Sequence, residues 1–201
     1  MIHVRTITEL HSTTVQQWHQ HQIDNQYEDF FEIVCRQHQQ NFKLWHQEDI
    51  ARSPDVSEAD LARVKRVIDK MNQQRNDLIE QLDDFLIHQL NLLGVKAQPN
   101  ARLNTETPGS VVDRLSILSL RIYHMEEQAF RTDASDDHIA KAKSRLEILY
   151  EQHRDLCQSL QELLDEIFAG RKCMKTYHQF KMYNDPTMNP YIYNAAKRPA
   201  A

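Results

Sequence analysis

The amino-acid sequence predicts an all-α fold, an antiparallel helical bundle built from a duplicated long helical hairpin. Apolar residues recur at helical spacing in four long stretches, and no strand pattern competes with them. All three glycines and all six prolines fall at the breaks between these stretches or in the last thirty residues. The sequence also repeats at a constant offset of 78 residues: Trp45-His46 corresponds to Tyr123-His124, and Asp77-Leu78 to Asp155-Leu156. Such internal similarity indicates duplication of a supersecondary unit.

We expect residues 1–201 to form a single domain, since this length is ordinary for one core. The first repeat covers about residues 27–93, the second about 108–170, and a tail follows at 171–201. Before the repeats, residues 1–10 are expected to form a short extended arm, followed by a short N-terminal helix that ends near Ile23.

In the first repeat, a helix is expected from Gln26 to Arg52, where the Ser53-Pro54-Asp55 segment breaks it. Ser57 with Asp60 three residues later resembles a capping box and opens a helix that runs to about Leu93. In the second repeat, the turn at 107–110 opens a helix that is apolar on two sides, which predicts the most buried helix of the bundle. Ser135 then starts the last long helix, and Gly170 ends it.

Composition excludes several classes of protein. The chain is 40% hydrophobic and 26% charged, with a net charge of −5, so nucleic acid is not an expected partner. No apolar run approaches the roughly 20 residues of a membrane span, and the N-terminus lacks a signal-peptide core, which predicts a cytoplasmic protein. Three cysteines without CxxC spacing disfavour structural zinc and a disulfide framework. The sequence leaves the oligomeric state open, and a homo-oligomer is one of the possibilities.

The tail interleaves lysines with aromatic residues around turn signals, as in Lys175, Tyr177, Phe180, Lys181 and Tyr183. We expect an irregular aromatic strap that buries Tyr177, Phe180 and Tyr183 against the bundle, because a free tail seldom carries so many rings. The alternative is a basic-aromatic surface that binds a sugar, a nucleotide or single-stranded nucleic acid, although the net negative charge of the chain argues against nucleic acid.

Polar residues at positions where the helical period calls for apolar ones are the candidates for function. Asn72 and Arg75 lie within the apolar stripe of the 57–93 helix. Adding polar and aromatic residues from the first helix of each repeat gives a candidate ligand-binding set: His38, Asn41, Trp45, Asn72, Arg75, Arg114, Arg121 and Tyr123. Arginine forks suit phosphate or carboxylate groups, so this set suggests an anionic small molecule. The alternative is a structural network that joins the hairpins, with Arg75 paired to an acid of the other repeat.

A second candidate set consists of potential metal ligands, namely His46, Glu48, Asp49, His124, Glu126 and Glu127. The His46/Asp49 and His124/Glu127 pairs are three residues apart, close enough on a helix to share a metal. The carboxylates suit Mg²⁺, and with arginines for phosphate they would resemble in outline an all-helical nucleotide pyrophosphohydrolase. The spacing departs from the ExxE pattern of that class.

Four motifs resemble the bacterial domain-of-unknown-function-4254 family. They are Leu44-Trp45-His46-x-Glu48-Asp49, Asn72-x-x-Arg75-Asn76-Asp77-Leu78-x-Glu80, the segment from Thr107 to Leu118, and Phe180-Lys181-Met182-Tyr183-Asn184-Asp185-Pro186. The resemblance covers nearly everything after about Tyr27. It implies no particular activity and assigns no catalytic residue, but some members of the family are encoded beside genes for lipopolysaccharide or other surface-glycan synthesis.

Three functions therefore remain. The first is a binding module for a phosphorylated sugar, sugar nucleotide or similar anion, linked to surface-glycan synthesis. The second is a Mg²⁺-dependent pyrophosphohydrolase-like enzyme. The third is a scaffold without activity, whose tail docks a glycan-synthesis protein. The sequence leaves open whether the protein is an enzyme.

Overall fold

The structure, a computed structural model, describes residues 2–179, 182 and 185–194. It is all-helical, as the sequence predicts, and the described residues contain no strand. Five long helices form the bundle and a short one lies in the tail: α1 Val4–Trp18, α2 Asp29–Arg52, α3 Glu58–Leu92, α4 Pro108–Ala129, α5 Asp136–Phe168 and α6 Pro190–Tyr193. Within the described residues, no helix combines the length and the apolar character needed to cross a bilayer.

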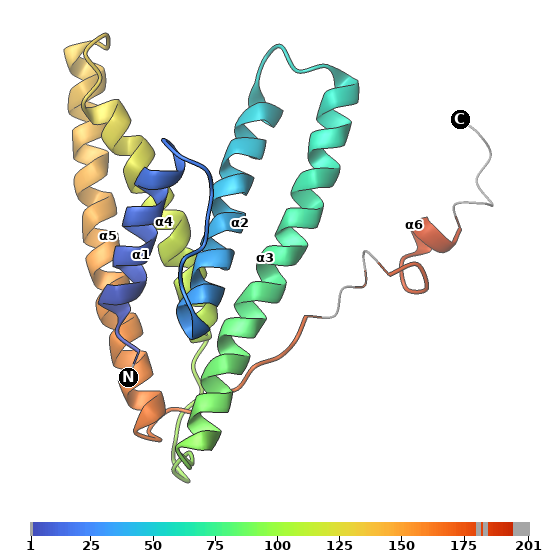
Figure 1. The fold of residues 1–201 in the computed structure, drawn as a ribbon, viewed down its shortest axis with the longest axis vertical. Helices are drawn as coiled ribbons and strands as arrows, with labels where there is room; N and C mark the ends of the chain where they lie inside the picture. The colour runs from blue at the N-terminus through green and yellow to red at the C-terminus, as the bar shows by residue number, and fades with distance from the viewer. Residues whose placement is uncertain (1, 180–181, 183–184, 195–201) are drawn as a thin grey trace.

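The long helices form two antiparallel hairpins, α2/α3 and α4/α5, which are joined at one end and diverge toward their turns (Figure 1). Helix α1 packs between them and contacts α2, α4 and α5. Helix α4 contacts all four other long helices, so the helix predicted to be most buried is the centre of the bundle. Its Leu115 and Leu120 are almost fully buried in the main core.

The helix starts follow the predicted capping chemistry. Ser57 accepts a hydrogen bond from the Asp60 N–H (3.1 Å), and Asp60 in turn accepts one from the Ser57 hydroxyl (2.7 Å). Ser135 caps α5 by accepting from the His138 N–H, and Thr107 caps α4 by accepting from the Ser110 N–H.

The extended arm predicted for residues 1–10 is wrong, because α1 already begins at Val4 and ends at Trp18. Its buried face has the helical spacing Ile7, Leu10, His11, Thr14, Val15 and Trp18. Two of these positions are polar, which hid the period from a pattern based on apolar residues.

Helix α2 likewise starts at Asp29 and not near Gln26. The Asn25 side chain accepts from the Tyr27 N–H and donates to the Glu32 carbonyl, a local turn that competes with helix.

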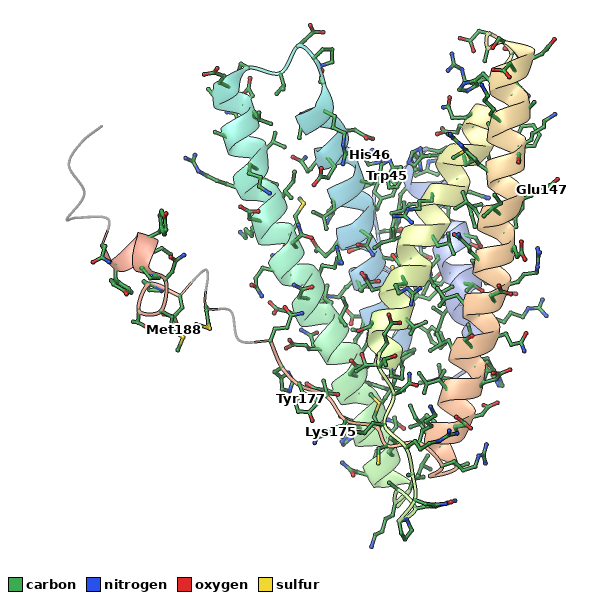
Figure 2. The ribbon with its side chains drawn as sticks, turned by 180° about the vertical axis from the view of Figure 1, so that it is seen from behind. Trp45, His46, Glu147, Lys175, Tyr177 and Met188 are labelled. Carbon is green, nitrogen blue, oxygen red and sulfur yellow. The ribbon has the colours of Figure 1, made fainter. Side chains whose placement is uncertain are left out.

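The tail is only partly a strap. Met174 packs against the core, His178 lies 2.9 Å from Glu80 of α3, and Gln179 donates its backbone N–H to the same carboxylate. The predicted burial of Tyr177 is wrong, since this side chain is 74% exposed and lies beside Lys175 (Figure 2). Phe180 and Tyr183 lie outside the described residues.

The joined end of the hairpins is closed by a backbone contact between α3 and the start of α4. The Gly109 N–H donates to Asp83 Oδ1 at 2.7 Å. A Cβ atom at position 109 would lie 2.6 Å from the carbonyl oxygen of Ile79, so only glycine fits without movement of a helix. Burial raises the pKa of Asp83 to about 6.

Candidate functional site

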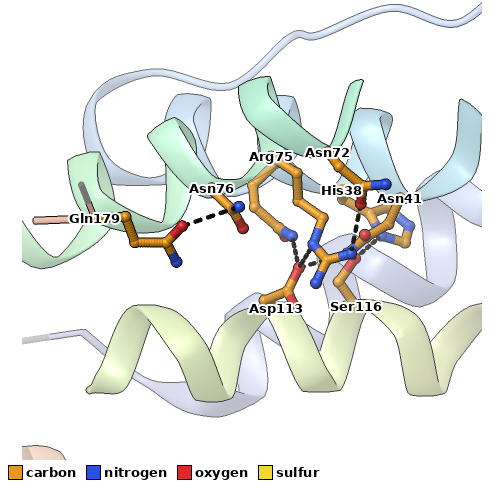
Figure 3. A network of polar contacts seen from close by, with 9 residues as sticks. His38, Asn41, Asn72, Arg75, Asn76, Asp113, Ser116 and Gln179 are labelled. Carbon is orange, nitrogen blue, oxygen red and sulfur yellow. Dashed lines mark hydrogen bonds and ion pairs between the residues drawn. The ribbon is translucent and has the colours of Figure 1, made fainter. Parts of the chain in front are cut away.

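Asp113 of α4 is the centre of a buried polar network between α2, α3 and α4 (Figure 3). Its Oδ1 atom accepts hydrogen bonds from the side-chain amides of Gln37 and Asn41, the latter at 3.0 Å. The Nε atom of Arg75 forms an ion pair with the same oxygen at 3.0 Å. The Nη1 atom of Arg75 donates a hydrogen bond to the side-chain oxygen of Asn72 at 3.3 Å. The acid that Arg75 needs therefore comes from the second hairpin.

The network continues through Ser116 to two buried histidines. Ser116 Oγ accepts from the Asn41 amide at 2.8 Å and lies 2.7 Å from His38 Nδ1. The His38 ring packs against His11 of α1, with ring centroids 4.6 Å apart, and against Trp18. Ser116, His38 and His11 are fully buried. This serine and histidine are sealed inside the bundle, so they are unsuited to attack a substrate.

Burial sets the charge states of this network. Burial raises the pKa of the Asp113 carboxyl, and the charge of Arg75 opposes that effect. Burial lowers the pKa of His38 to about 3 and that of His11 well below its ordinary value. Both histidines are therefore neutral at pH 7. Asp113 and Arg75 form an internally compensated pair, which leaves little net charge for an external ligand.

A second cluster, which we call the histidine layer, lies next to the network along α2 and α4. It consists of His19, Trp45, His46, Tyr123 and His124. Trp45 stacks on His124 with ring centroids 4.7 Å apart, and Tyr123 stacks on His19 at 4.1 Å. Trp45 and His46 lie on the side of α2 that faces the second hairpin (Figure 2). Burial lowers the pKa of His46, and the neighbouring His19 and His124 lower it further.

The predicted carboxylate ligands do not assemble around this layer. Glu127 lies 2.7 Å from His124 Nδ1, whereas Glu48 and Asp49 lie near Arg52 at 2.9 and 3.8 Å. Glu126 instead accepts a hydrogen bond from the Tyr150 hydroxyl. Across the described part of the chain, no group of three or more His, Cys, Asp or Glu side chains is positioned to hold a metal ion.

A groove of about 890 Å³ lies along α4 and α5, and we call it the α4/α5 groove. Arg114, Arg121 and Lys172 line it, together with four carboxylates from Glu106, Asp155, Glu162 and Glu166. Arg114 is paired with Glu106 at 2.7 Å, and Lys172 donates to Asn104 at 3.1 Å. For Arg121, no carboxylate of the described residues lies within ion-pair distance, so its guanidinium is available to a ligand.

A smaller cavity of about 270 Å³ lies between α1, α4 and α5 and is lined in part by Tyr123, Tyr150 and His153. Close to it, Cys157 Sγ lies 3.6 Å from His153 Nδ1, an arrangement that could suggest a cysteine nucleophile. Burial raises the pKa of Cys157 and lowers that of His153. Both shifts oppose formation of the thiolate and imidazolium pair, so the geometry does not indicate nucleophilic catalysis.

The structure divides the predicted ligand-binding set among three places. His38, Asn41, Asn72 and Arg75 belong to the network, Trp45 and Tyr123 to the histidine layer, and Arg114 and Arg121 to the α4/α5 groove. Sequence reasoning missed Asp113 and His19. Asp113 lies three residues before Ser116 on the same helical face, so extending that face by one turn would have identified it.

Comparison with known proteins supports the resemblance in the sequence motifs. No curated protein and no solved structure matches the chain. Residues 31–176 match the family model described as "Protein of unknown function (DUF4254)". That match covers well over half of the chain, and it includes both hairpins and the start of the tail. The chain therefore belongs to the DUF4254 family.

Proposed function

We propose that this protein is a binding module for a phosphorylated sugar, sugar nucleotide or similar anion, and that its site is the α4/α5 groove. The observation that carries the proposal is Arg121, a guanidinium without an ion-pair partner among the described residues, in a polar groove of about 890 Å³. That volume lies within the range of small-molecule sites. A planar fork of donors suits a phosphate group.

The charged residues that line the α4/α5 groove limit which ligands can bind there. Three basic side chains face four carboxylates, so a triphosphate would meet substantial repulsion. Carboxylates and the amide of Gln152 are instead acceptors and donors for hydroxyl groups. A ligand with many hydroxyls and few phosphates fits this balance best. We place this function in the bacterial cytoplasm and link it to surface-glycan synthesis, an extension that rests on the family resemblance.

Calorimetric titration tests the proposal, with a hexose 1-phosphate, a UDP-sugar and a GDP-sugar as probes in the presence of a chelator. We expect binding of at least one probe, and we expect Arg121→Ala to weaken it about 10-fold or more, as for loss of a charge-assisted contact. Arg145→Ala is the matched control, because this exposed arginine of α5 lies outside the groove. Failure of all three probes, or equal affinity in Arg121→Ala, contradicts the proposal.

The exposed tail favours the scaffold as a second candidate. Tyr177 is 74% exposed and Tyr191 71%, and interface contacts are enriched in tyrosine. A glycan-synthesis protein that binds this tail should lose affinity when both residues are changed to serine. The Mg²⁺-dependent hydrolase receives less support, because Glu48, Glu126 and Glu127 contact three different partners.

We also propose that the hairpins arose by duplication. Residues 78 apart in sequence meet across the bundle at His38 and Ser116, and the rings of His46 and His124, which are also 78 apart, lie 6.1 Å from each other. Related sequences should then show the same offset at these positions. A set of relatives in which the offset disappears would contradict a duplication.

A further inference from the structure

Three histidines from separate helical segments face one another in the histidine layer. His19 follows the last residue of α1, His46 lies on α2 and His124 on α4. The ring centroid of His19 lies 5.3 Å from that of His46 and 5.1 Å from that of His124, and the last two are 6.1 Å apart. The three rings are nearly perpendicular to one another, with interplanar angles of 75°, 78° and 89°.

Hydrogen bonding fixes the tautomers of two of these rings. His19 Nδ1 lies 2.6 Å from the Val15 carbonyl oxygen, and His124 Nδ1 lies 2.7 Å from a Glu127 carboxylate oxygen. Both partners only accept, so each Nδ1 atom carries the proton and each neutral ring keeps its lone pair on Nε2. The Nε2 atoms of His19 and His124 are shielded from solvent and have no hydrogen-bond partner among the described residues.

This is the arrangement in which histidine binds a metal. A metal-ligating imidazole usually donates its other N–H to a backbone carbonyl or a carboxylate, which orients the ring. Two of the rings are also held by their neighbours, since Tyr123 stacks on His19 and Trp45 stacks on His124. A buried lone pair without a donor is costly, and a metal ion would satisfy both Nε2 atoms together.

The ring separations fit such an ion. With metal–nitrogen bonds of about 2.0–2.1 Å, imidazole rings around a tetrahedral ion have centroids roughly 5.2 Å apart. Two of the three separations already agree, and only the His46–His124 distance is too long. The side chains of the described residues do not form a metal site as they stand, so binding requires the His46 ring to move toward His124. Rotation about χ2 would leave the centroid of the His46 ring in place, so this movement is a change of χ1 or a small shift of α2 relative to α4.

We propose that His19, His46 and His124 form a binding site for one divalent transition-metal ion, of the class of Zn²⁺, Co²⁺ or Ni²⁺, with a fourth coordination position left open. Imidazole nitrogen favours these ions over Mg²⁺. Glu127 is a positioning residue, because it holds the ring of His124 and does not itself bind the ion. This site is independent of the α4/α5 groove.

Metal titration of the full-length, untagged, chelator-treated protein tests the site. We expect one Zn²⁺ or Co²⁺ per chain, the visible absorption of tetrahedral Co²⁺, and no competition from Mg²⁺. Each of His19→Ala, His46→Ala and His124→Ala should weaken binding about 100-fold or more. Glu127→Gln should weaken it about 10- to 100-fold, the range for loss of an outer hydrogen-bond partner.

His138→Ala is the matched control, because His138 is an exposed histidine at the start of α5 and should not affect the titration. Circular dichroism establishes that each variant is folded. Glu127 is half exposed, so Glu127→Gln keeps the test informative if a histidine variant unfolds. The proposal is overturned if the wild-type protein binds no ion. It is also overturned if the single variants and the triple variant bind as the wild type does, which would mean adventitious binding to other histidines.

Discussion

The buried network and the histidine layer lie next to each other on the same two helices, yet only the network is centred on a buried carboxylate. In the network, Asp113 gathers Gln37, Asn41 and Arg75, although His38 Nε2 and Gln37 Oε1 have no hydrogen-bond partner among the described residues. In the histidine layer, His19 and His124 each satisfy Nδ1 and leave Nε2 buried without a described partner. Polar residues on an apolar stripe can therefore stabilise the fold by pairing with one another, or they can leave buried acceptor atoms that a bound ion would satisfy.

The largest expected effect is at the centre of the network. Asp113→Ala removes the acceptor of two amides and leaves Arg75 uncompensated, which should lower the free energy of unfolding by about 3–5 kcal/mol. Urea denaturation followed by circular dichroism measures it. Glu147→Ala, on the exposed face of α5, should change this free energy by less than about 0.5 kcal/mol. A loss below about 1 kcal/mol for Asp113→Ala would mean that the network does not support the fold.

Arg75→Met should have a smaller effect, about 2–3 kcal/mol, because the Arg75 side chain is 27% exposed whereas Asp113 is almost buried. The sequence suggests either a ligand-binding role or a structural network for Arg75, and the contact with Asp113 favours the network. Adding Asp113→Leu to Arg75→Met should cost less than the sum of the two single changes, because the pair is removed as a unit. Additive losses would show that the two side chains act independently.

The pH dependence of stability should reveal the buried histidines. The unfolded chain protonates them near pH 6.5, whereas folded His38 resists until about pH 3 and folded His11 is shifted in the same direction. Their contribution is thus complete above pH 6.5 and is lost as the pH falls. His11→Leu should reduce the loss of stability between pH 7 and pH 5, which urea denaturation at both pH values measures. An unchanged pH dependence would place His11 in a solvated environment.

The smallest effect should come from the histidine layer. In the metal-free protein, His46→Leu should change the free energy of unfolding by less than about 1 kcal/mol, because no hydrogen bond or ion pair ties His46 to the described residues. Chemical denaturation in a chelator measures this change. A loss comparable to that of Asp113→Ala would erase the distinction between the two regions.

The sequence predicted the features that depend on local chemistry and failed where tertiary contacts decide. The caps at Ser57 and Ser135 follow from residues a few positions away. The inward position of Arg75 follows from the helical period, and a partner from the other repeat was one of the alternatives considered. The helical face could have identified Asp113 as an inward residue but not as the partner of Arg75, because the pairing depends on how α3 and α4 pack. The prediction for the tail was wrong for a related reason. The aromatic content of the tail predicted that Tyr177 is buried, but the contact of His178 with α3 leaves Tyr177 exposed.

The close approach at Gly109 lies at the end of the molecule where the two hairpins join, so a change at this contact would rotate α4 about that end. Helix α4 extends for twenty residues beyond Gly109, a lever arm of about 30 Å. A rotation of about 5° at this contact would move the far end of the arm by roughly 2.6 Å. The hairpins already diverge in that direction (Figure 1). A larger side chain at position 109 would therefore displace the turn end of α4 more than it displaces the contact itself.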